Sequence, residues 1–268
     1  MTTFFSKPAG DRIRSAWWAF LLLGLGWAIW TNRPKHRTSC RLKGRDVSIV
    51  IKIGDLFDVG GALVIGSNTT FDTELSVDLI SERSVQGQFT RKFYDSSAHL
   101  DADIDRSLAG VPRTEIPARA HGKRFSYPIG TTASVRPKGR TAYLVAVASL
   151  NEHGVAHGTF DDIKSSLPAL WEYVATRGDL QPLVMPVLGT GFSRLPQTRE
   201  EIVREIVQSF VAACAAQRPC ESLTIVIPIA DFYDHSVDLD ELERFTQHVC
   251  KYSDAPNPPV AGRGRAVE

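Results

Sequence analysis

The segment Val47-Ser-Ile-Val-Ile-Lys-Ile-Gly-Asp-Leu-Phe-Asp58 decides the fold, because a short β-branched run ends at a glycine and continues into a polar turn. Apolar runs of four to eight residues that are closed by turn residues are typical of strands in a sheet. Similar runs follow at residues 62–65, 142–148, 183–188 and 223–229. The sequence therefore predicts five strands.

Predicted helices alternate with the later strands, at residues 160–176, 198–217 and 237–252. The first helix has two aspartates in its opening turn, and Thr198 precedes the second as a predicted N-cap; both features favour a helix start. Strands that alternate with helices predict an α/β fold of three layers, in which a mixed, mostly parallel sheet lies between two layers of helices.

The composition limits the size of the protein and the kind of partner it binds. With 268 residues and 43% apolar content, the chain can form one globular domain with an appendage. Residues 1–45 hold nine basic residues and one acidic residue, whereas residues 46–268 hold 22 basic and 29 acidic residues. Nucleic-acid binding depends mainly on the neutralisation of phosphates. The acidic body therefore argues against a nucleic-acid partner, and the basic end needs a separate explanation.

An uncharged stretch at residues 15–32 supplies that explanation. As a helix rising ~1.5 Å per residue it would be about 27 Å long, close to the ~30 Å of a hydrocarbon core. Indole rings prefer the two headgroup levels of a bilayer. Four of the five tryptophans stand at the two ends of the stretch, as Trp17, Trp18, Trp27 and Trp30. We therefore expect one N-terminal transmembrane helix at residues 15–32.

The flanks of this stretch predict its orientation and the organisation of the chain. Basic residues are more numerous after the stretch than before it, which places the body in the cytoplasm, at the cell inner membrane. A cleaved signal peptide is disfavoured by the basic stretch that follows, and a soluble core helix by the apolar character of all faces. The expected parts are a flank at 1–14, the helix, a basic linker at 33–45, a ligand-binding domain at 46–252 and a disordered tail at 253–268.

The four cysteines, Cys40, Cys214, Cys220 and Cys250, show no paired spacing. A chain of this length does not need disulfides to hold its core. We therefore expect reduced and mostly buried thiols.

Unusual residues follow three of the predicted strands, and parallel α/β sheets bind their ligands at the carboxyl ends of strands. Asp55 and Leu56 follow the first strand, and Asn68 and Thr69 follow the second. Glycines let backbone amides approach an anion closely, and a helix N-terminus favours one. Such a loop, suited to phosphate, follows the fourth strand and consists of Gly189, Thr190, Gly191, Phe192, Ser193 and Arg194. The loop matches neither a dinucleotide fingerprint nor a P-loop.

Together these motifs resemble the macro domain, an ADP-ribose-binding α/β/α module. The resemblance implies that Asp55 accepts from the adenine amino group, with the Leu56 amide nearby, and that Asn68 faces the distal ribose. It also implies that the loop at 189–195 binds the diphosphate and that the ring of Phe232 or Tyr233 stacks on the adenine side. The expected ligand is an ADP-ribose derivative, without a metal ion or another cofactor.

The chain departs from ordinary macro domains after Asn68, where those domains have a glycine-rich phosphate loop. Residues 71–74 are Phe-Asp-Thr-Glu, and residues 80–89 are Ile-Ser-Glu-Arg-Ser-Val-Gln-Gly-Gln-Phe. This pattern is similar to a divergent branch, the membrane-linked macro-domain effector of type II Thoeris anti-phage systems. The resemblance covers about residues 46–252. Two membrane spans are usual in that branch, whereas one is visible here.

This branch implies a membrane sensor that forms homo-oligomers and responds to an ADP-ribose conjugate made by a partner TIR-domain enzyme. Ser84, Gln86 and Gly87 would contact the ligand in place of the missing loop. Gln86 and Arg194 are expected to contact the part of the ligand beyond ADP-ribose, because they offer donors at glycine-like positions.

Two other functions fit parts of the sequence. Hydrolytic macro domains hold a water with the glycine-rich loop, which residues 69–90 lack, so an ADP-ribosyl hydrolase is the alternative to the sensor. An anchored scaffold with a vestigial pocket is the third interpretation. His153 and His157 have the spacing of a metal pair, but their glycine neighbours favour a loop.

Residues 95–125 form an insertion to which the sequence assigns no role. Asp101, Asp103 and Asp105 alternate as in a calcium loop, yet the required glycine and glutamate do not follow. We therefore expect a solvated loop there.

Overall fold

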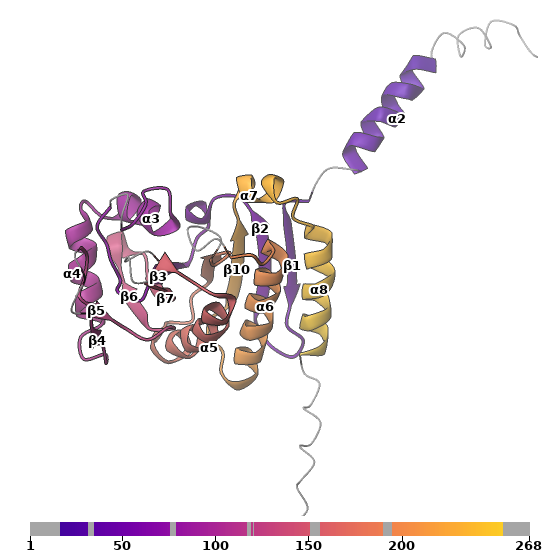
Figure 1. The fold of residues 1–268 in the computed structure, drawn as a ribbon. Helices are drawn as coiled ribbons and strands as arrows, with labels where there is room; N and C mark the ends of the chain where they lie inside the picture. Colours follow the sequence, from indigo (N-terminus) through magenta and orange to yellow (C-terminus); the bar gives the residue numbers. More distant parts are fainter. Residues whose placement is uncertain are drawn as a thin grey trace, which may run out of the picture. The chain divides into compact units, whose positions relative to one another are not determined.

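The computed structural model divides into two compact units, residues 1–36 and residues 37–268 (Figure 1). The structure describes residues 17–31, 35–75, 79–116, 119, 121–150, 156–189 and 195–253. The predicted flank at 1–14 lies outside these residues, as does the predicted tail after Ser253.

The first unit contains helix α2 (Trp17–Thr31), which has 15 residues. Its described side chains are exposed, including those of the consecutive leucines Leu21, Leu22 and Leu23. Among the described residues, no helix combines the length and the apolar character that crossing a membrane requires.

The second unit is built on a sheet that has eight strands within the described residues. The order is β1-β2-β10-β9-β3-β7-β6, and β8 pairs with β7. Strands β2, β10, β9, β3 and β7 are parallel, whereas β1, β6 and β8 are antiparallel to their neighbours. The predicted mixed, mostly parallel sheet is therefore confirmed. The bounds are β1 (Arg37–Arg41), β2 (Ser48–Ile53), β3 (Ala62–Asn68), β6 (Thr132–Val135), β7 (Ala142–Leu150), β8 (Ala156–His157), β9 (Leu183–Pro186) and β10 (Ser222–Ile227).

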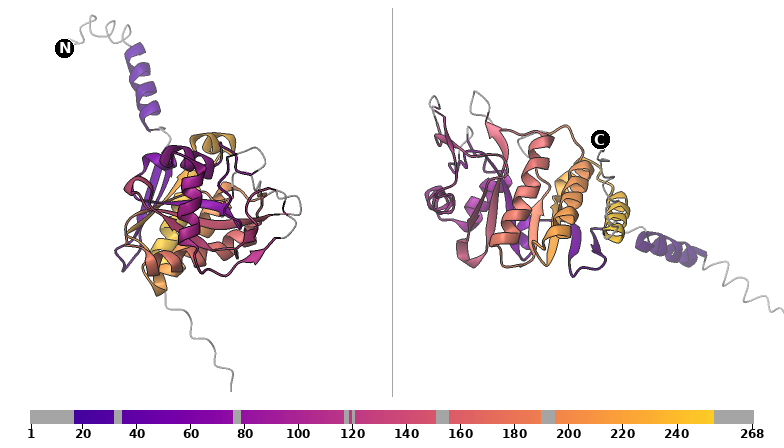
Figure 2. Two further views of the ribbon diagram at one scale, coloured as in Figure 1. Left: turned by 90° about the vertical axis from the view of Figure 1, so that its left-hand side faces the viewer. Right: turned by 90° about the horizontal axis from the view of Figure 1, so that it is seen from below.

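Helices cover the sheet and enclose two apolar clusters, as the α/β pattern predicts (Figure 2). Helices α5 (Phe160–Arg177), α6 (Arg199–Ala216) and α8 (Leu239–Tyr252) lie side by side over the larger cluster. There the rings of Trp171 and Phe210 meet edge to face at 5.2 Å. The smaller cluster lies under α3 (Val85–Phe93) and α4 (Ser97–Ser107). Short elements complete the unit: η1 (Leu56–Asp58), β4 (Thr114–Glu115), β5 (Phe125–Ser126), η2 (Pro137–Gly139) and α7 (Ile229–Asp234).

The predicted helix starts are confirmed by their caps. Thr198 accepts from the Glu201 amide, and the Glu201 side chain accepts from the Thr198 amide, which closes a capping box before α6. Thr159 and Asp162 form the same box before α5. These local signals fix both starts because each satisfies amides that would otherwise have no partner inside the helix.

Two segments differ from the sequence-based prediction. Residues 37–41, expected in the linker at 33–45, form β1 and pair with β2 at the edge of the sheet. An edge strand can be held by backbone pairing without a continuous apolar run, so the apolar pattern does not indicate it. Residues 97–107, expected in a solvated loop, form α4, because Leu100 and Ile104 lie one turn apart and are completely buried.

The cysteines also differ from the expectation of reduced thiols. Cys40 on β1 and Cys250 at the end of α8 form a disulfide, with Cα atoms 6.5 Å apart. The two residues are 210 positions apart, so their approach depends on the packing of α8 beside β1. Cys214 and Cys220 are free and buried as expected, and burial raises the pKa of their thiols to about 11 and about 12.

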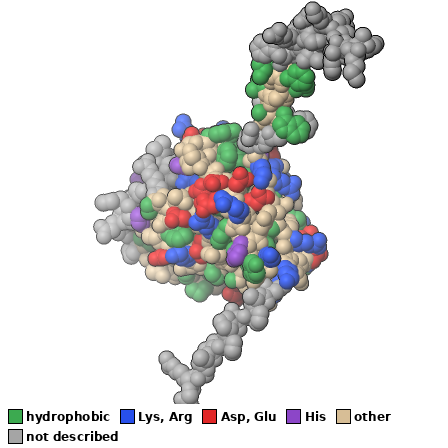
Figure 3. Space-filling view, turned by 90° about the vertical axis from the view of Figure 1, so that its right-hand side faces the viewer, with side chains coloured by type: hydrophobic (Ala, Val, Ile, Leu, Met, Phe, Trp, Pro, Cys, Tyr) green, Lys and Arg blue, Asp and Glu red, His purple; other side chains and the backbone are tan. Residues whose placement is uncertain are grey.

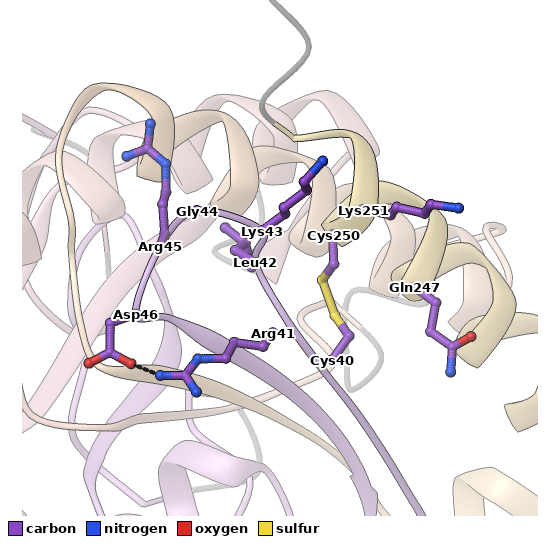
Figure 4. A pocket seen from close by; sticks show the side chains of 10 residues that line it. All are labelled: Cys40, Arg41, Leu42, Lys43, Gly44, Arg45, Asp46, Gln247, Cys250 and Lys251. Atoms are coloured by element: carbon purple, nitrogen blue, oxygen red, sulfur yellow. Dashed lines mark hydrogen bonds and ion pairs between the residues drawn. A yellow bond between two sulfur atoms is a disulfide. The ribbon is translucent and has the colours of Figure 1, made fainter.

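A pocket of about 660 Å³ lies beside this disulfide, between the β1–β2 turn and the last turn of α8 (Figure 4). Four basic residues contribute to its lining, and Arg41 is paired with Asp46. The face over α8 carries acidic and basic side chains together (Figure 3). The lining consists of Cys40, Arg41, Leu42, Lys43, Gly44, Arg45, Asp46, Gln247, Cys250 and Lys251.

Candidate functional site

The parallel strands bring most of the predicted site residues to one edge of the sheet. Strands β2, β10, β9 and β3 are adjacent and parallel, so their carboxyl ends lie together. Asp55 follows β2, Phe232 follows β10, Gly189 follows β9 and Asn68 ends β3. Figure 1 shows β10 running toward α7 at this edge. Sequence segments that are far apart therefore meet where α/β sheets bind ligands.

Asp55 is an exposed residue whose side chain caps the short helix η1. Its Oδ1 accepts from the Phe57 amide at 2.8 Å and so closes the η1 turn, while Leu56 is buried beneath. A pocket of about 380 Å³ opens beside it, and the Lys92 Nζ lies 5.2 Å from the centroid of the Phe57 ring. The pocket is lined by Asp55, Phe57, Glu82, Gln88, Arg91 and Lys92.

Arg140 holds the turn that presents Asp55, a role that no sequence motif indicates. Its guanidinium donates to the carbonyl oxygens of Gly61 at 2.8 Å, Phe57 at 3.2 Å and Val59. Burial lowers the pKa of Arg140, but the three carbonyls lie where its planar group can donate to all of them. The position of Asp55 therefore depends on a residue that lies between η2 and β7.

Asn68 lies in a buried network rather than at an open surface. Its Nδ2 donates to Asp72 Oδ2 at 3.0 Å, and its Oδ1 accepts from Thr70 Oγ1 at 3.0 Å. The Asp72 amide donates to the same Oδ1 at 3.2 Å. Thr69 is also buried, and its backbone bonds to Ala148 and Tyr127. The network fixes the end of β3.

The centre of this network is the ion pair between Asp72 and Arg119, whose side chains are 1% and 6% exposed. Arg119 donates to both carboxylate oxygens, at 3.0 and 2.7 Å, and the Lys123 amide donates to Oδ1 at 2.9 Å. Burial alone would raise the pKa of Asp72, but the hydrogen bonds from Arg119, Thr70 and Lys123 hold it below its ordinary value. The motifs of the sequence do not predict this pair, because its two residues are 47 positions apart.

Residues 84–88 form the start of α3 and are hydrogen-bonded to the same network. Ser84 caps the helix by accepting from the Gly87 amide at 3.0 Å. A Cβ at Gly87 would lie 2.2 Å from the Ser81 carbonyl oxygen, so the contact requires glycine. Gln86 is buried and donates to the Asp72 carbonyl oxygen at 2.6 Å. This hydrogen bond uses one of the two hydrogens of its side-chain amide, and the expected donation to a ligand stays a prediction.

The predicted phosphate loop begins where β9 ends. Gly189 has a φ of +72°, and a Cβ there would lie 2.5 Å from Leu195 Cδ1 and 2.7 Å from Ile163 Cδ1. Only glycine fits this turn without strain. The other predicted loop residues, Thr190, Gly191, Phe192, Ser193 and Arg194, lie outside the described residues.

The two predicted aromatic residues lie on α7, directly after β10. Phe232 is partly buried against the larger core cluster, whereas Tyr233 is 62% exposed. Their rings meet edge to face, with centroids 5.2 Å apart. Arg199 at the start of α6 pairs with Asp231 at 2.9 Å, which ties α7 to the helix after the phosphate loop.

The last feature considered from the sequence is a metal site at His153 and His157. His153 lies outside the described residues, and His157 lies on β8. Within the part of the chain that the structure describes, no group of three or more His, Cys, Asp or Glu side chains is placed to hold a metal ion.

Comparison with known proteins assigns this arrangement to a family. The sequence model described as "Thoeris protein ThsA, Macro domain" matches residues 49–228, which is more than half of the chain. The chain belongs to the ThsA macro-domain family. The Thoeris protein ThsA of Bacillus amyloliquefaciens (strain Y2) is 25% identical over 167 residues, covering 59% of this chain and 53% of that protein. The chain thus spans about half the length of the curated relative it matches.

Solved macro domains share the fold at low sequence identity. The Oceanobacillus iheyensis macrodomain with ADP is 14% identical, covers 78% of this chain and 99% of its own, and has a TM-score of 0.50. A mutant of the same macrodomain is 14% identical, covers 81% and 98%, and has a TM-score of 0.52. These likenesses support the macro-domain fold.

The match to the ThsA macro domain contains most of the candidate site. Asp55, Asn68, Asp72 and Gly189 fall within residues 49–228. The aromatic residues of α7 follow directly after the matched region. The disulfide partners Cys40 and Cys250 lie outside it, so the disulfide is a feature of the flanking elements of this chain.

Proposed function

We propose that this chain is a sensor and effector of anti-phage defence that binds an ADP-ribose-derived signal nucleotide. In this proposal a partner TIR-domain enzyme makes the signal, and the bound chain oligomerises and acts at the membrane. The macro-domain family and the arrangement of the candidate site support the ligand class.

The observation that carries this proposal is the meeting of four polar or aromatic features at the ends of four adjacent parallel strands. Asp55 would accept from the adenine amino group, and the rings of α7 would cover the base. The turn at Gly189 would bring backbone amides to the diphosphate, and Asn68 would face the distal ribose. The pocket beside Asp55, at about 380 Å³, is within the size range of ligand sites.

The network around Asn68 supports binding rather than hydrolysis. The place of a glycine-rich loop is taken here by Asp72, Thr70 and Gln86, whose polar groups are hydrogen-bonded to one another or to Asn68. A hydrolase would need a group free to hold and activate a water beside the ribose. We therefore assign the site to recognition.

The proposed membrane association rests on the amino-terminal segment 15–32. Leu21, Leu22 and Leu23 are 60%, 59% and 70% exposed on α2, and consecutive helical residues point in different directions. An uncharged helix that is apolar on all faces is favoured in lipid. The macro domain would lie on the cytoplasmic side of the inner membrane. Ligand binding could drive assembly only through a difference in affinity between the separate and the assembled state.

Calorimetry of the full chain in detergent tests the ligand proposal, with ADP-ribose and ADP-ribose conjugates as probes. Asp55→Asn keeps the acceptor that caps η1 but replaces the second oxygen with a donor, so we expect affinity to fall by about tenfold. Asp58→Asn, in the same turn but outside the pocket lining, is the matched control. A folded sample that releases no heat at millimolar ligand would contradict the proposal, and release of free ADP-ribose from a conjugate would favour the hydrolase.

Flotation with lipid vesicles tests the membrane proposal separately. The full chain should float with the vesicles, and Leu22→Asp should reduce the floating fraction, because a carboxylate in an apolar segment opposes insertion. Tyr252→Asp adds the same charge at an exposed apolar position of the macro domain and should not change flotation. Equal flotation of the wild type and Leu22→Asp would count against residues 15–32 as the anchor.

A further inference from the structure

The partners of Asn68 decide which way its side-chain amide points. A carboxylate can only accept a hydrogen bond, and a backbone amide can only donate one. Nδ2 must therefore face Asp72 Oδ2, while Oδ1 must face the Asp72 amide. The single hydroxyl proton of Thr70 lies within hydrogen-bond distance of both Asn68 Oδ1 and Asp72 Oδ2, at 3.0 and 2.5 Å. The contact with Asp72 uses only one of the two hydrogens of Nδ2. The remaining N–H of Asn68 is the group available to a ligand acceptor.

Asp72 can impose this orientation only if its own carboxylate stays fixed, and Arg119 fixes it. The guanidinium donates to both oxygens of the carboxylate, which allows one orientation of the carboxylate plane. Arg119 Nη1, which donates to Asp72 Oδ1, also donates to the Lys123 carbonyl oxygen at 2.7 Å. This second bond fixes the guanidinium against the backbone four residues further along the chain. Both side chains are nearly completely buried, so water competes little for these bonds.

Gly122 and Lys123, which follow Arg119 in the chain, also pack closely against the Asp72 carboxylate. Gly122 has a φ of +82°, and a Cβ there would lie 2.6 Å from Asp72 Oδ1 and 2.8 Å from Arg119 Cζ. Lys123 Nζ pairs with Asp101 at 2.6 Å and with Asp105 at 2.8 Å, which ties the segment to α4. Asp101 and Asp105, two of the alternating acidic residues, thus bind Lys123 from helix α4.

We propose that Arg119 is a positioning residue of the ligand site, which acts through Asp72 to aim the free N–H of Asn68 at the distal ribose. This inference rests on the proposed function, because it assumes that Asn68 faces the ribose of an ADP-ribose-type ligand.

Calorimetry of the full chain in detergent with two probes, ADP-ribose and ADP, tests this proposal. ADP lacks the distal ribose, so it reports on the rest of the site. We expect Arg119→Gln to weaken ADP-ribose binding by about tenfold and to change ADP binding less than about twofold. Arg113→Gln is the matched control, because Arg113 lies directly before β4, six positions from Arg119, and its guanidinium stacks on the Phe125 ring, 3.8 Å from the centroid. In an Asn68→Ala background, Arg119→Gln should produce no further loss.

The outcomes separate this proposal from the proposed function. If the wild type binds neither probe, the proposed function itself has failed. If the wild type binds both probes, equal losses for both in Arg119→Gln would indicate a merely structural role, and unchanged ADP-ribose affinity would also overturn the proposal. Should Arg119→Gln not fold, Arg119→Lys takes its place, since it keeps the charge but cannot donate to both oxygens in the same plane. Its loss should then be smaller and again confined to ADP-ribose.

Discussion

At the scale of single residues, Asp72 links three parts of the macro domain that the sequence keeps apart. Its carboxylate holds Asn68 at the end of β3 and receives Arg119 from the insertion. Its carbonyl oxygen accepts from Gln86 at the start of α3. A buried charge is favourable only when all of its partners are in place, so the loss of one partner disturbs all three parts.

The titration of Asp72 predicts how stability depends on pH. Its folded pKa lies below the ordinary 3.8, so its ionised form stabilises the fold above about pH 4, and this contribution is lost as the pH falls through the folded pKa. Asp72→Asn should therefore lower the free energy of unfolding by about 3 kcal/mol at neutral pH. The difference from the wild type should shrink below about pH 4. Urea denaturation across this pH range measures it.

The control for this prediction is an ion pair at the surface. Asp46 is 74% exposed and pairs with Arg41, so Asp46→Asn should change the free energy of unfolding by less than about 1 kcal/mol at any pH. A pH-independent effect of Asp72→Asn would show that the lost interaction is not that of the ionised carboxylate.

At the scale of elements, the parts that could be predicted from the sequence are those fixed by local chemistry. The strands of the sheet centre are apolar runs because both of their faces are covered, and Thr198 marks the start of α6 by its own hydrogen bond. Asp55, Asn68 and Gly189 could be located because each follows such a strand. The residues that hold them could not, since Arg119 and Arg140 act through contacts across 47 and about 80 positions.

The turn after β9 depends on Gly189, and this dependence predicts how a substitution there changes the stability of the fold. Gly189 and Gly110 both have positive φ, but a Cβ at Gly110 would meet no atom within 4 Å. Gly189→Ala should lower the free energy of unfolding by about 2–4 kcal/mol, from both strain and overpacking, whereas Gly110→Ala should lower it by about 1 kcal/mol from strain alone. Urea denaturation of the two variants tests the difference.

The same pair of variants separates the turn's role in binding from its role in stability. We expect Gly189→Ala to weaken ADP-ribose binding, because Leu195 and Ile163 must shift to make room for the Cβ at the start of the predicted phosphate loop. Gly110 follows α4, and a Cβ there meets no atom within 4 Å, so Gly110→Ala should bind as the wild type does. Equal effects of both variants on folding and binding would indicate that the contacts of Gly189 have no special role.

At the scale of the whole molecule, the disulfide joins the first strand of the second unit to its last helix, on either side of the macro-domain region. The enclosed loop spans 210 residues and includes every candidate site residue. A crosslink lowers the conformational entropy of the unfolded chain, and the decrease is larger for a longer loop. Strand β1 is also where the chain enters the macro domain from the first unit, so the bond fixes the strand nearest that junction in sequence.

Reduction of the Cys40–Cys250 bond should therefore destabilise the domain without changing its ligand site. We expect a reductant, or the Cys40→Ser/Cys250→Ser double variant, to lower the free energy of unfolding by about 3 kcal/mol. Thiol titration of the denatured chain should find the two free cysteines before reduction and all four after it. Four titratable thiols without reductant would contradict the bond. ADP-ribose affinity should stay constant, because the disulfide lies beside the β1–β2 turn, at the edge of the sheet opposite to Asp55 and Asn68.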